Sequence, residues 1–329
     1  MIQGLFSVEE VAAMILDGKK MTVAGDAKLL AQLPKGDWIG GSTPFFILQQ
    51  GGRVTSHDKL FVNQLPNFVT ETVIKEYDET NIRDIFIDGQ QNGFTVLIIP
   101  YNSPIYLEYT LNATKYKNFA AHPVCGWVSG QPLEVIQTEK SYTASGTDSN
   151  IYTEKAVAMH VSLPENKFAE IHIYTPYQQG DGDIITFDYE GLTLKDAFIN
   201  GERRNFAEYL REINYNESIP FTADYCGAPI SVVTCYISED EVLMAVPVFK
   251  SLEYRLSTID KNIVEPSMSD DKIVFSVTCV GFFIQPELCQ QYLKKMNGPV
   301  VYGEIAYQMV SQTTVYVTIN DVILNTETI

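Results

Sequence analysis

The chain has 329 residues, enough for one large domain or two, and its 41 acidic and 23 basic residues give a formal net charge of −18. Nucleic acids and anionic membrane surfaces are bound through clusters of Lys and Arg, so we expect neither kind of partner. We also expect no membrane insertion, because no apolar run approaches the roughly 18 residues of a spanning helix. The first residues lack a signal-peptide pattern, and the five cysteines contain no CxxC pair. These features predict a cytoplasmic protein with reduced cysteines.

A helix and three strand–helix–strand units are the most regular features of the sequence. Ser7 and Glu10 have the spacing of a capping box, and the helix that follows is expected to end at Gly18. The three units comprise residues 20–46, 94–130 and 272–302. Their spacings do not match residue for residue, so internal duplication and the ordinary recurrence of such units both stay open.

The region between the second and third units contains mainly strand patterns. Residues 131–155 are polar and predict a surface excursion, and three strands follow within residues 156–189. After a turn at Asn200-Gly201 we expect a helix at residues 205–213 and a hairpin within residues 230–249. The predicted fold class is therefore mixed α/β (α+β), with two related halves whose mixed sheets are flanked by helices. We place the boundary near residue 200, which gives domains of residues 1–200 and 201–329.

Enzyme motifs are incomplete in this sequence. Residues 40–44, GGSTP, begin like a nucleophile elbow, but Pro44 stands where the second glycine belongs. Cys125 has His122 close by in the chain, without a third catalytic member. The four histidines are scattered and no nucleotide-binding motif is present, so we expect neither a metal nor a cofactor. Catalysis is not expected, and a small-molecule hydrolase using Ser42 or Cys125 is the alternative.

Several short segments follow the motif order of a known family. They are IGGST at residues 39–43, FAEYLREI at 206–213, APISVV at 228–233, KSLEYRLSTID at 250–260, KIVFSVTCVGFF at 272–283, GEI at 303–305 and QTT at 312–314. In this order they resemble the N-terminal and C-terminal parts of the FIST domain, a bacterial sensory module, over nearly the whole chain. The resemblance implies a sensory, signal-transduction protein that binds a small ligand, such as an amino acid or related metabolite, without catalysis. It also implies a separate signalling output protein as partner, because no segment here resembles an output module.

The ligand site is expected where two glycine-bearing strands would meet. Its predicted residues are Trp38, Gly40, Gly41, Ser42, Thr43, Arg255, Tyr302, Gly303 and Glu304. The glycines would let a ligand approach the backbone closely, and Trp38 and Tyr302 would supply apolar walls. Glu304 would accept a hydrogen bond from a cationic amine, and Arg255 would hold a carboxylate in a bidentate fork. The competing interpretations are an internal salt bridge or backbone cap for Glu304, a surface strand residue for Arg255, and a non-catalytic partner-binding protein for the whole chain.

Overall fold

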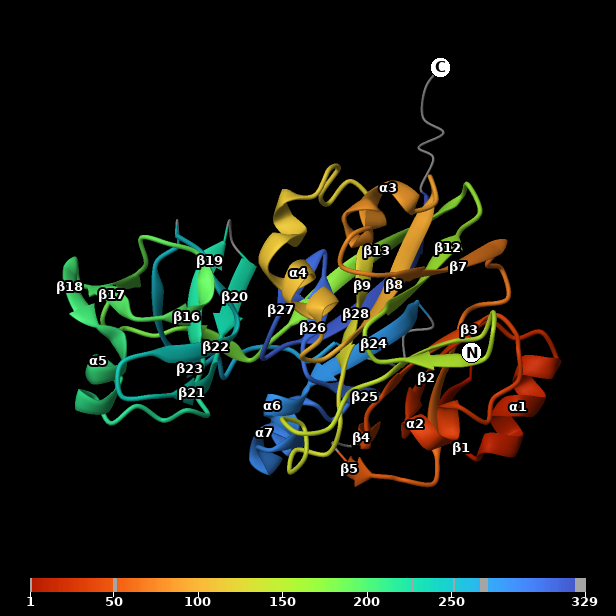
Figure 1. The fold of residues 1–329 in the computed structure, drawn as a ribbon, viewed down its shortest axis with the longest axis horizontal. Helices are drawn as coiled ribbons and strands as arrows, with labels where there is room; N and C mark the ends of the chain where they lie inside the picture. Colours follow the sequence, from red (N-terminus) through yellow and green to blue (C-terminus); the bar gives the residue numbers. More distant parts are fainter. Residues whose placement is uncertain (1, 50–51, 226–227, 251, 267–271, 323–329) are drawn as a thin grey trace, which may run out of the picture.

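The computed structural model describes residues 2–49, 52–225, 228–250, 252–266 and 272–322. It confirms the predicted fold class, because helices cover sheets that contain both parallel and antiparallel pairs (Figure 1). Within the described ranges, no helix is long and apolar enough to cross a membrane.

Three six-stranded sheets form the main body of the molecule. The first has the order β1 (Gln3–Phe6), β6 (Leu60–Gln64), β2 (Met21–Gly25), β3 (Trp38–Ser42), β10 (Thr143–Ser145) and β11 (Asn150–Tyr152). The second has the order β27 (Gln308–Val310), β26 (Glu304–Ala306), β9 (Val124–Ser129), β8 (Gly93–Pro100), β12 (Ala156–Ser162) and β7 (Glu71–Tyr77). The third has the order β13 (Lys167–Tyr174), β28 (Thr314–Asp321), β24 (Ile273–Cys279), β25 (Gly298–Val301), β4 (Phe45–Leu48) and β5 (Gly52–Thr55).

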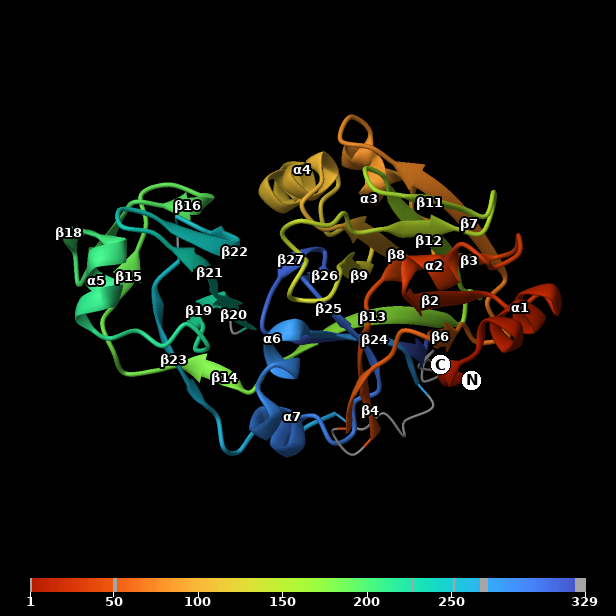
Figure 2. The same cartoon turned by 60° about the horizontal axis from the view of Figure 1, so that its bottom comes forward.

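Residues 177–259 form a separate part of the molecule, which we call the distal lobe. One of its sheets has the order β18 (Glu202–Asn205), β17 (Asp196–Ile199), β15 (Ile185–Thr186), β23 (Tyr254–Ile259), β19 (Phe221–Tyr225) and β20 (Ala228–Val232), and β14 (Tyr177–Gln179) also pairs with β23. The other sheet contains β16 (Gly191–Leu194), β22 (Val242–Val248) and β21 (Thr234–Ile237). The lobe lies at the left of the main body in Figures 1 and 2.

The helices are short and follow the strands they cover. They are α1 (Val8–Leu16), α2 (Ala27–Leu30), the 3₁₀ turn η2 (Ile82–Asp84), α3 (Ile85–Asp88), α4 (Pro104–Asn112), the 3₁₀ turn η3 (Ala113–Lys115), α5 (Phe206–Glu212), α6 (Val280–Phe283) and α7 (Pro286–Tyr292). The predicted capping box of α1 is present: the Ser7 hydroxyl accepts from the Glu10 N–H, and the Glu10 carboxylate accepts from the Ser7 N–H. Both contacts satisfy amides that the helix itself leaves unpaired.

The three predicted strand–helix–strand units each give a parallel strand pair. These pairs are β2 with β3, β8 with β9, and β24 with β25, with helices in each connection. A crossover helix is the usual way to bring two consecutive strands parallel, so these pairs agree with the predicted units. The other strand pairs of the described residues are antiparallel, including the long pairs β13 with β28 and β12 with β8.

In the second sheet β8, β9 and β12 are buried on both faces, and successive side chains of these strands point into two different cores. On β8, Phe94, Val96 and Ile98 pack toward the first and third sheets. Leu97 and Ile99, on the opposite face, pack in the core that also contains α4 residues and the distal lobe. The alternation follows from the two-residue period of a strand. The second sheet therefore joins the main core to the lobe.

Strand pairing crosses the expected boundary at residue 200 repeatedly. Asn200 lies in the turn of the β17–β18 hairpin, inside the distal lobe. In the second sheet β26 pairs with β9, and in the third β28 pairs with β13 and β25 with β4. The strands following the lobe thus return to complete sheets begun by the first half of the chain.

Candidate functional site

The two glycine-bearing strands of the predicted site converge on the end of β9. The Gly130 N–H donates to the Ser42 carbonyl over 2.7 Å, which attaches the end of β3 to this position. On the other side the Val128 N–H donates to the Gly303 carbonyl over 2.8 Å, and the Tyr302 N–H donates to the Val128 carbonyl over 3.1 Å. The segments at residues 40–43 and 302–304 are therefore both neighbours of residues 128–130.

Protein atoms occupy the space that a Cβ would need at the glycines of this junction. A Cβ on Gly41 would lie 2.7 Å from Ile98 Cγ2 and 2.8 Å from Trp127 Nε1, and one on Gly40 would lie 2.8 Å from the Val23 carbonyl oxygen. Real Cβ contacts are not so short, so only glycine permits this close packing of β3 against its neighbours. The predicted close approach to the glycine backbone does occur. The groups that approach it are the adjoining strands and the Trp127 indole.

The polar groups of the same segment are also bound internally. The Trp38 indole N–H donates to the Pro34 carbonyl over 2.8 Å. The Ser42 hydroxyl accepts from the Tyr142 N–H over 2.9 Å, and the Thr43 hydroxyl donates to the Val300 carbonyl over 2.6 Å. All three side chains are buried. Tyr302 is half-buried, and its hydroxyl donates to the Gln131 carbonyl.

Glu304 is fully buried on β26 and is an internal acceptor. Its Oε1 accepts from both the backbone N–H and the hydroxyl of Thr313, over 2.8 and 2.7 Å. The Cys279 thiol also interacts with the carboxylate, but a thiol is a weak donor, and Oε2 has no conventional hydrogen-bond partner. Within the described residues no cation forms an ion pair with Glu304. Burial, opposed by the Thr313 contacts, raises the pKa of Glu304 to about 8.

The backbone beside Glu304 has an uncommon conformation. Gln312, which precedes its hydrogen-bonding partner, has a φ of 57°, a left-handed value that is uncommon for a non-glycine residue. The Gln312 amide lies so close to Gly281 that a Cβ there would meet its Nε2 at 2.1 Å, and its Oε1 has no hydrogen-bond partner. Of the two earlier interpretations of Glu304 as an internal group, the backbone cap describes its contacts, and the ion pair does not.

Arg255 lies away from these strands. It is on β23 in the distal lobe, where it pairs with Thr222, and its guanidinium donates to the Gly182 carbonyl. The structure therefore does not bring Arg255 together with the Glu304 environment, which belongs to the second sheet.

Neither candidate nucleophile has a hydrogen-bonded base among the residues that the structure describes. Cys125 is fully buried; its thiol contacts the Thr95 carbonyl, and burial raises its pKa. Ser42 is buried and bound as described. Among the hydrogen bonds of the described residues, none joins a histidine to either group, and His122 contacts the Thr95 hydroxyl instead.

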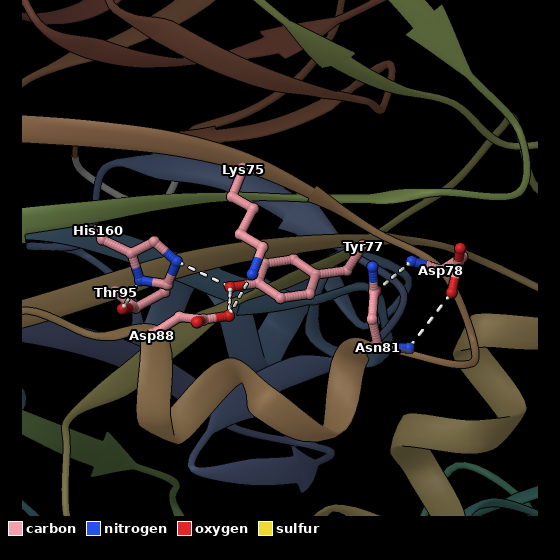
Figure 3. A network of polar contacts seen from close by, with 7 residues as sticks. All are labelled: Lys75, Tyr77, Asp78, Asn81, Asp88, Thr95 and His160. Atoms are coloured by element: carbon pink, nitrogen blue, oxygen red, sulfur yellow. Dashed lines mark hydrogen bonds and ion pairs between the residues drawn. The ribbon is translucent and has the colours of Figure 1, made fainter.

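A chain of polar contacts that the sequence did not reveal connects three strands of the second sheet to α3 (Figure 3). Asp88 Oδ2 accepts from Lys75 Nζ over 2.6 Å and from the Tyr77 hydroxyl over 2.8 Å. The Tyr77 hydroxyl oxygen also lies 2.9 Å from His160 Nε2, and His160 Nδ1 lies 2.7 Å from the Thr95 hydroxyl oxygen.

The donor directions along this chain follow from the carboxylate. An ionised Asp88 can only accept, so Tyr77 donates to it and the Tyr77 oxygen accepts from His160 Nε2–H. His160 Nδ1 must then accept from Thr95, whose oxygen also lies 2.9 Å from His122 Nε2. Burial lowers the pKa of His160 to about 4, which keeps the ring neutral as this arrangement requires. The chain fastens α3 to β7, β8 and β12.

An open cleft of about 260 Å³ lies between the main body and the distal lobe. Figures 1 and 2 place α4 and β27 on the side of the main body that faces the lobe. The cleft is lined by Thr110, Leu111, Asn112, Ala113, Thr114, Lys115, Glu190, Gly191, Pro247, Phe249, Gln308 and Met309. These residues come from the end of α4, from the lobe strands β16 and β22 with their flanks, and from β27. None of them was predicted from the sequence, because no local pattern joins segments so far apart.

The lining of the cleft is half polar and half apolar, and it carries two opposite charges. Leu111, Phe249 and Met309 provide apolar surface. Lys115, on the body side, keeps its ammonium near the Leu111 carbonyl and the Asn112 side chain at 3.3 Å. Glu190, on the lobe side, is exposed. Small ligands often bind at domain interfaces, and this cleft is more polar than most such pockets.

The fold and this cleft define a mixed α/β protein with a two-sided pocket between a main body and a lobe. The chain belongs to a family of unknown function (DUF6976), whose model matches residues 6–320. No curated protein matches the chain.

Proposed function

We propose that this protein binds a small zwitterionic ligand, an amino acid or related metabolite, in the cleft and acts as a sensory protein. The observation that carries the proposal is the placement of Lys115 and Glu190 on opposite walls of one cleft. Lys115 would bind the ligand carboxylate and Glu190 the ligand ammonium, both as charge-assisted contacts. The volume of about 260 Å³ is slightly below that of pockets for drug-sized molecules and suits a smaller ligand.

The position of the cleft supports a sensory role. A ligand that contacts both walls favours the arrangement of body and lobe in which both contacts are made, and this preference is the basis of a conformational signal. The cleft residues Gln308 and Met309 pair with Ala306 and Ile305 on β26, the strand that carries Glu304. A ligand therefore touches the hairpin that leads to the buried carboxylate. The FIST resemblance supports the same function, with a separate output protein receiving the signal.

A ligand screen followed by matched variants tests the proposal. The twenty amino acids and the common polyamines are screened by thermal shift, and each hit is measured by calorimetry with wild type, Lys115→Gln and Glu190→Gln. Loss of one charge-assisted contact is expected to weaken binding by roughly 10-fold or more, since such a contact contributes about 1.5–3 kcal/mol. Lys117→Gln and Asp188→Asn remove exposed charges that do not line the cleft and are expected to leave affinity unchanged. A panel without a hit, or hits that both cleft variants bind normally, would refute this site.

A further inference from the structure

Three consecutive backbone amides converge on one carboxylate after the end of α7. The Lys294 N–H donates to Glu265 Oε2 over 2.9 Å. The N–H groups of Lys295 and Met296 donate to Glu265 Oε1 over 2.6 and 3.1 Å. Glu265 is thus held almost entirely by main-chain donors, which lie 29–31 residues later in the chain.

Converging backbone amides of this kind form an anion-binding concavity. Two features suit it to an anion with more charge than a carboxylate. The side chains of Lys294 and Lys295 are exposed, and in the described part of the chain neither ammonium takes part in an ion pair. Lys295 acts on Glu265 through its charge without forming an ion pair, so both ammonium groups can contact an anion at this position, although the chain as a whole is strongly acidic.

Glu265 has the features of a removable occupant. It is only half-buried, and the side chain before it, Val264, is 80 % exposed. Ile263 packs against the core that contains Leu293 and Met296, so the segment does not depend on the carboxylate contacts alone. Burial raises the pKa of Glu265, whereas the three amides and the charge of Lys295 lower it, so the surroundings of this carboxylate favour a bound anion.

We propose that the amides of Lys294, Lys295 and Met296, together with the two lysine side chains, form a binding site for the phosphate group of a small ligand. The Glu265 carboxylate occupies this site when the ligand is absent. A tethered group acts at an effective concentration on the order of millimolar, so an external phosphate must compete with it. The site is separate from the inter-lobe cleft, and the proposal does not depend on the function proposed above.

Removing the internal carboxylate is the direct test. Glu265→Ala, Glu265→Gln and wild type are titrated with inorganic phosphate at constant ionic strength, with sodium chloride as the salt control, and Tm is recorded. We expect a saturable rise of roughly 2 °C or more in Glu265→Ala. Half-saturation is expected at a phosphate concentration at least about 10-fold lower than in wild type, because the tethered competitor is gone. Glu287→Ala removes an exposed acidic side chain from α7 nearby and is expected to behave as wild type.

The outcomes distinguish an anion-binding site from hydrogen bonds that only hold Glu265 and its segment in place. If neither Glu265 variant responds to phosphate more than Glu287→Ala does, the amides are not an anion site and the proposal fails. An equal response in wild type and variants would refute the internal occupancy. Acetate is titrated in parallel, and a response as strong as that to phosphate would refute the phosphate class, because the lysines would then contribute nothing. If Glu265→Ala does not fold, Glu265→Gln decides, since it keeps the side-chain length and one acceptor while removing the charge.

Discussion

Glu304 gives the sharpest prediction about stability. Its pKa in the folded protein is about 8 against an ordinary value of 4.5, because burial disfavours the charged form. Below pH 4.5 the carboxyl group is protonated in the folded and the unfolded chain alike. Between pH 4.5 and 8 the unfolded chain loses this proton while the folded protein retains it, so rising pH favours unfolding. At about 1.36 kcal/mol per pH unit, the carboxyl group lowers the free energy of unfolding by up to roughly 5 kcal/mol across this range.

Glu304→Gln isolates this contribution. The amide oxygen can still accept from Thr313, but the amide N–H groups take the place of Oε2, where no acceptor is present, at a cost of about 1–3 kcal/mol. The variant is therefore expected to be less stable than wild type at pH 5 and more stable at pH 9. Urea unfolding at pH 5 to 9 measures the difference, and the fluorescence of the buried Trp38 and Trp127 reports the transition. Glu287→Gln, at an exposed position, is the control.

The crossing of the two stability profiles is the decisive feature. If wild type and Glu304→Gln differ by the same amount at every pH, Glu304 does not titrate between pH 4.5 and 8 and the reasoning from burial is wrong. A uniform loss of about 3–5 kcal/mol would instead indicate a buried charge pair that the described contacts do not contain. Retained stability with weakened amine-ligand binding would point to the ligand role first inferred from the sequence.

Three further predictions follow from the remaining buried groups. Tyr77→Phe leaves Asp88 without one donor and the His160 N–H without its acceptor, and is expected to lower the free energy of unfolding by about 1–3 kcal/mol in urea titrations, whereas an unchanged midpoint would contradict the polar chain. Because the pKa of His160 is lowered to about 4, wild type is expected to lose roughly 3 kcal/mol between pH 6.5 and 4 relative to His160→Gln, and parallel acid profiles would argue against a neutral buried ring. Iodoacetamide is expected to label the accessible Cys235 slowly in the native protein, because desolvation raises the pKa of its thiol to about 11, and Cys125 only after unfolding, which peptide mass spectrometry measures; rapid native labelling of Cys125 would contradict its burial.

Local sequence patterns predicted the elements whose partners are close in the chain. The capping box of α1 and the three strand–helix–strand units are of this kind, and each unit gave its parallel pair. The polar segment 131–155 was expected on the surface, but it contains β10, whose three residues are all buried. These residues are small and alternate too briefly to show a period, and their burial depends on pairing with β3 more than a hundred residues earlier.

The polar chain at α3 shows the same limit for functional groups. The histidines are scattered in the sequence, which gave no basis for joining them, yet His122 and His160 both contact the Thr95 hydroxyl. They meet because β12 and β8 are adjacent and β9 follows the crossover helix of β8. Contacts of this type depend on strand order and register, which a single sequence does not encode locally.

The glycine-bearing strands illustrate why a correct structural signal can indicate the wrong partner. A missing Cβ shows that some group approaches the backbone closely, but it does not show whether that group belongs to a ligand or to the protein. At Gly41 the approaching atoms are Ile98 and Trp127, and at Gly303 they are Met309 and Val128. Met309 also lines the inter-lobe cleft. The glycine at position 303 therefore lets the hairpin that borders the cleft pack tightly against β9.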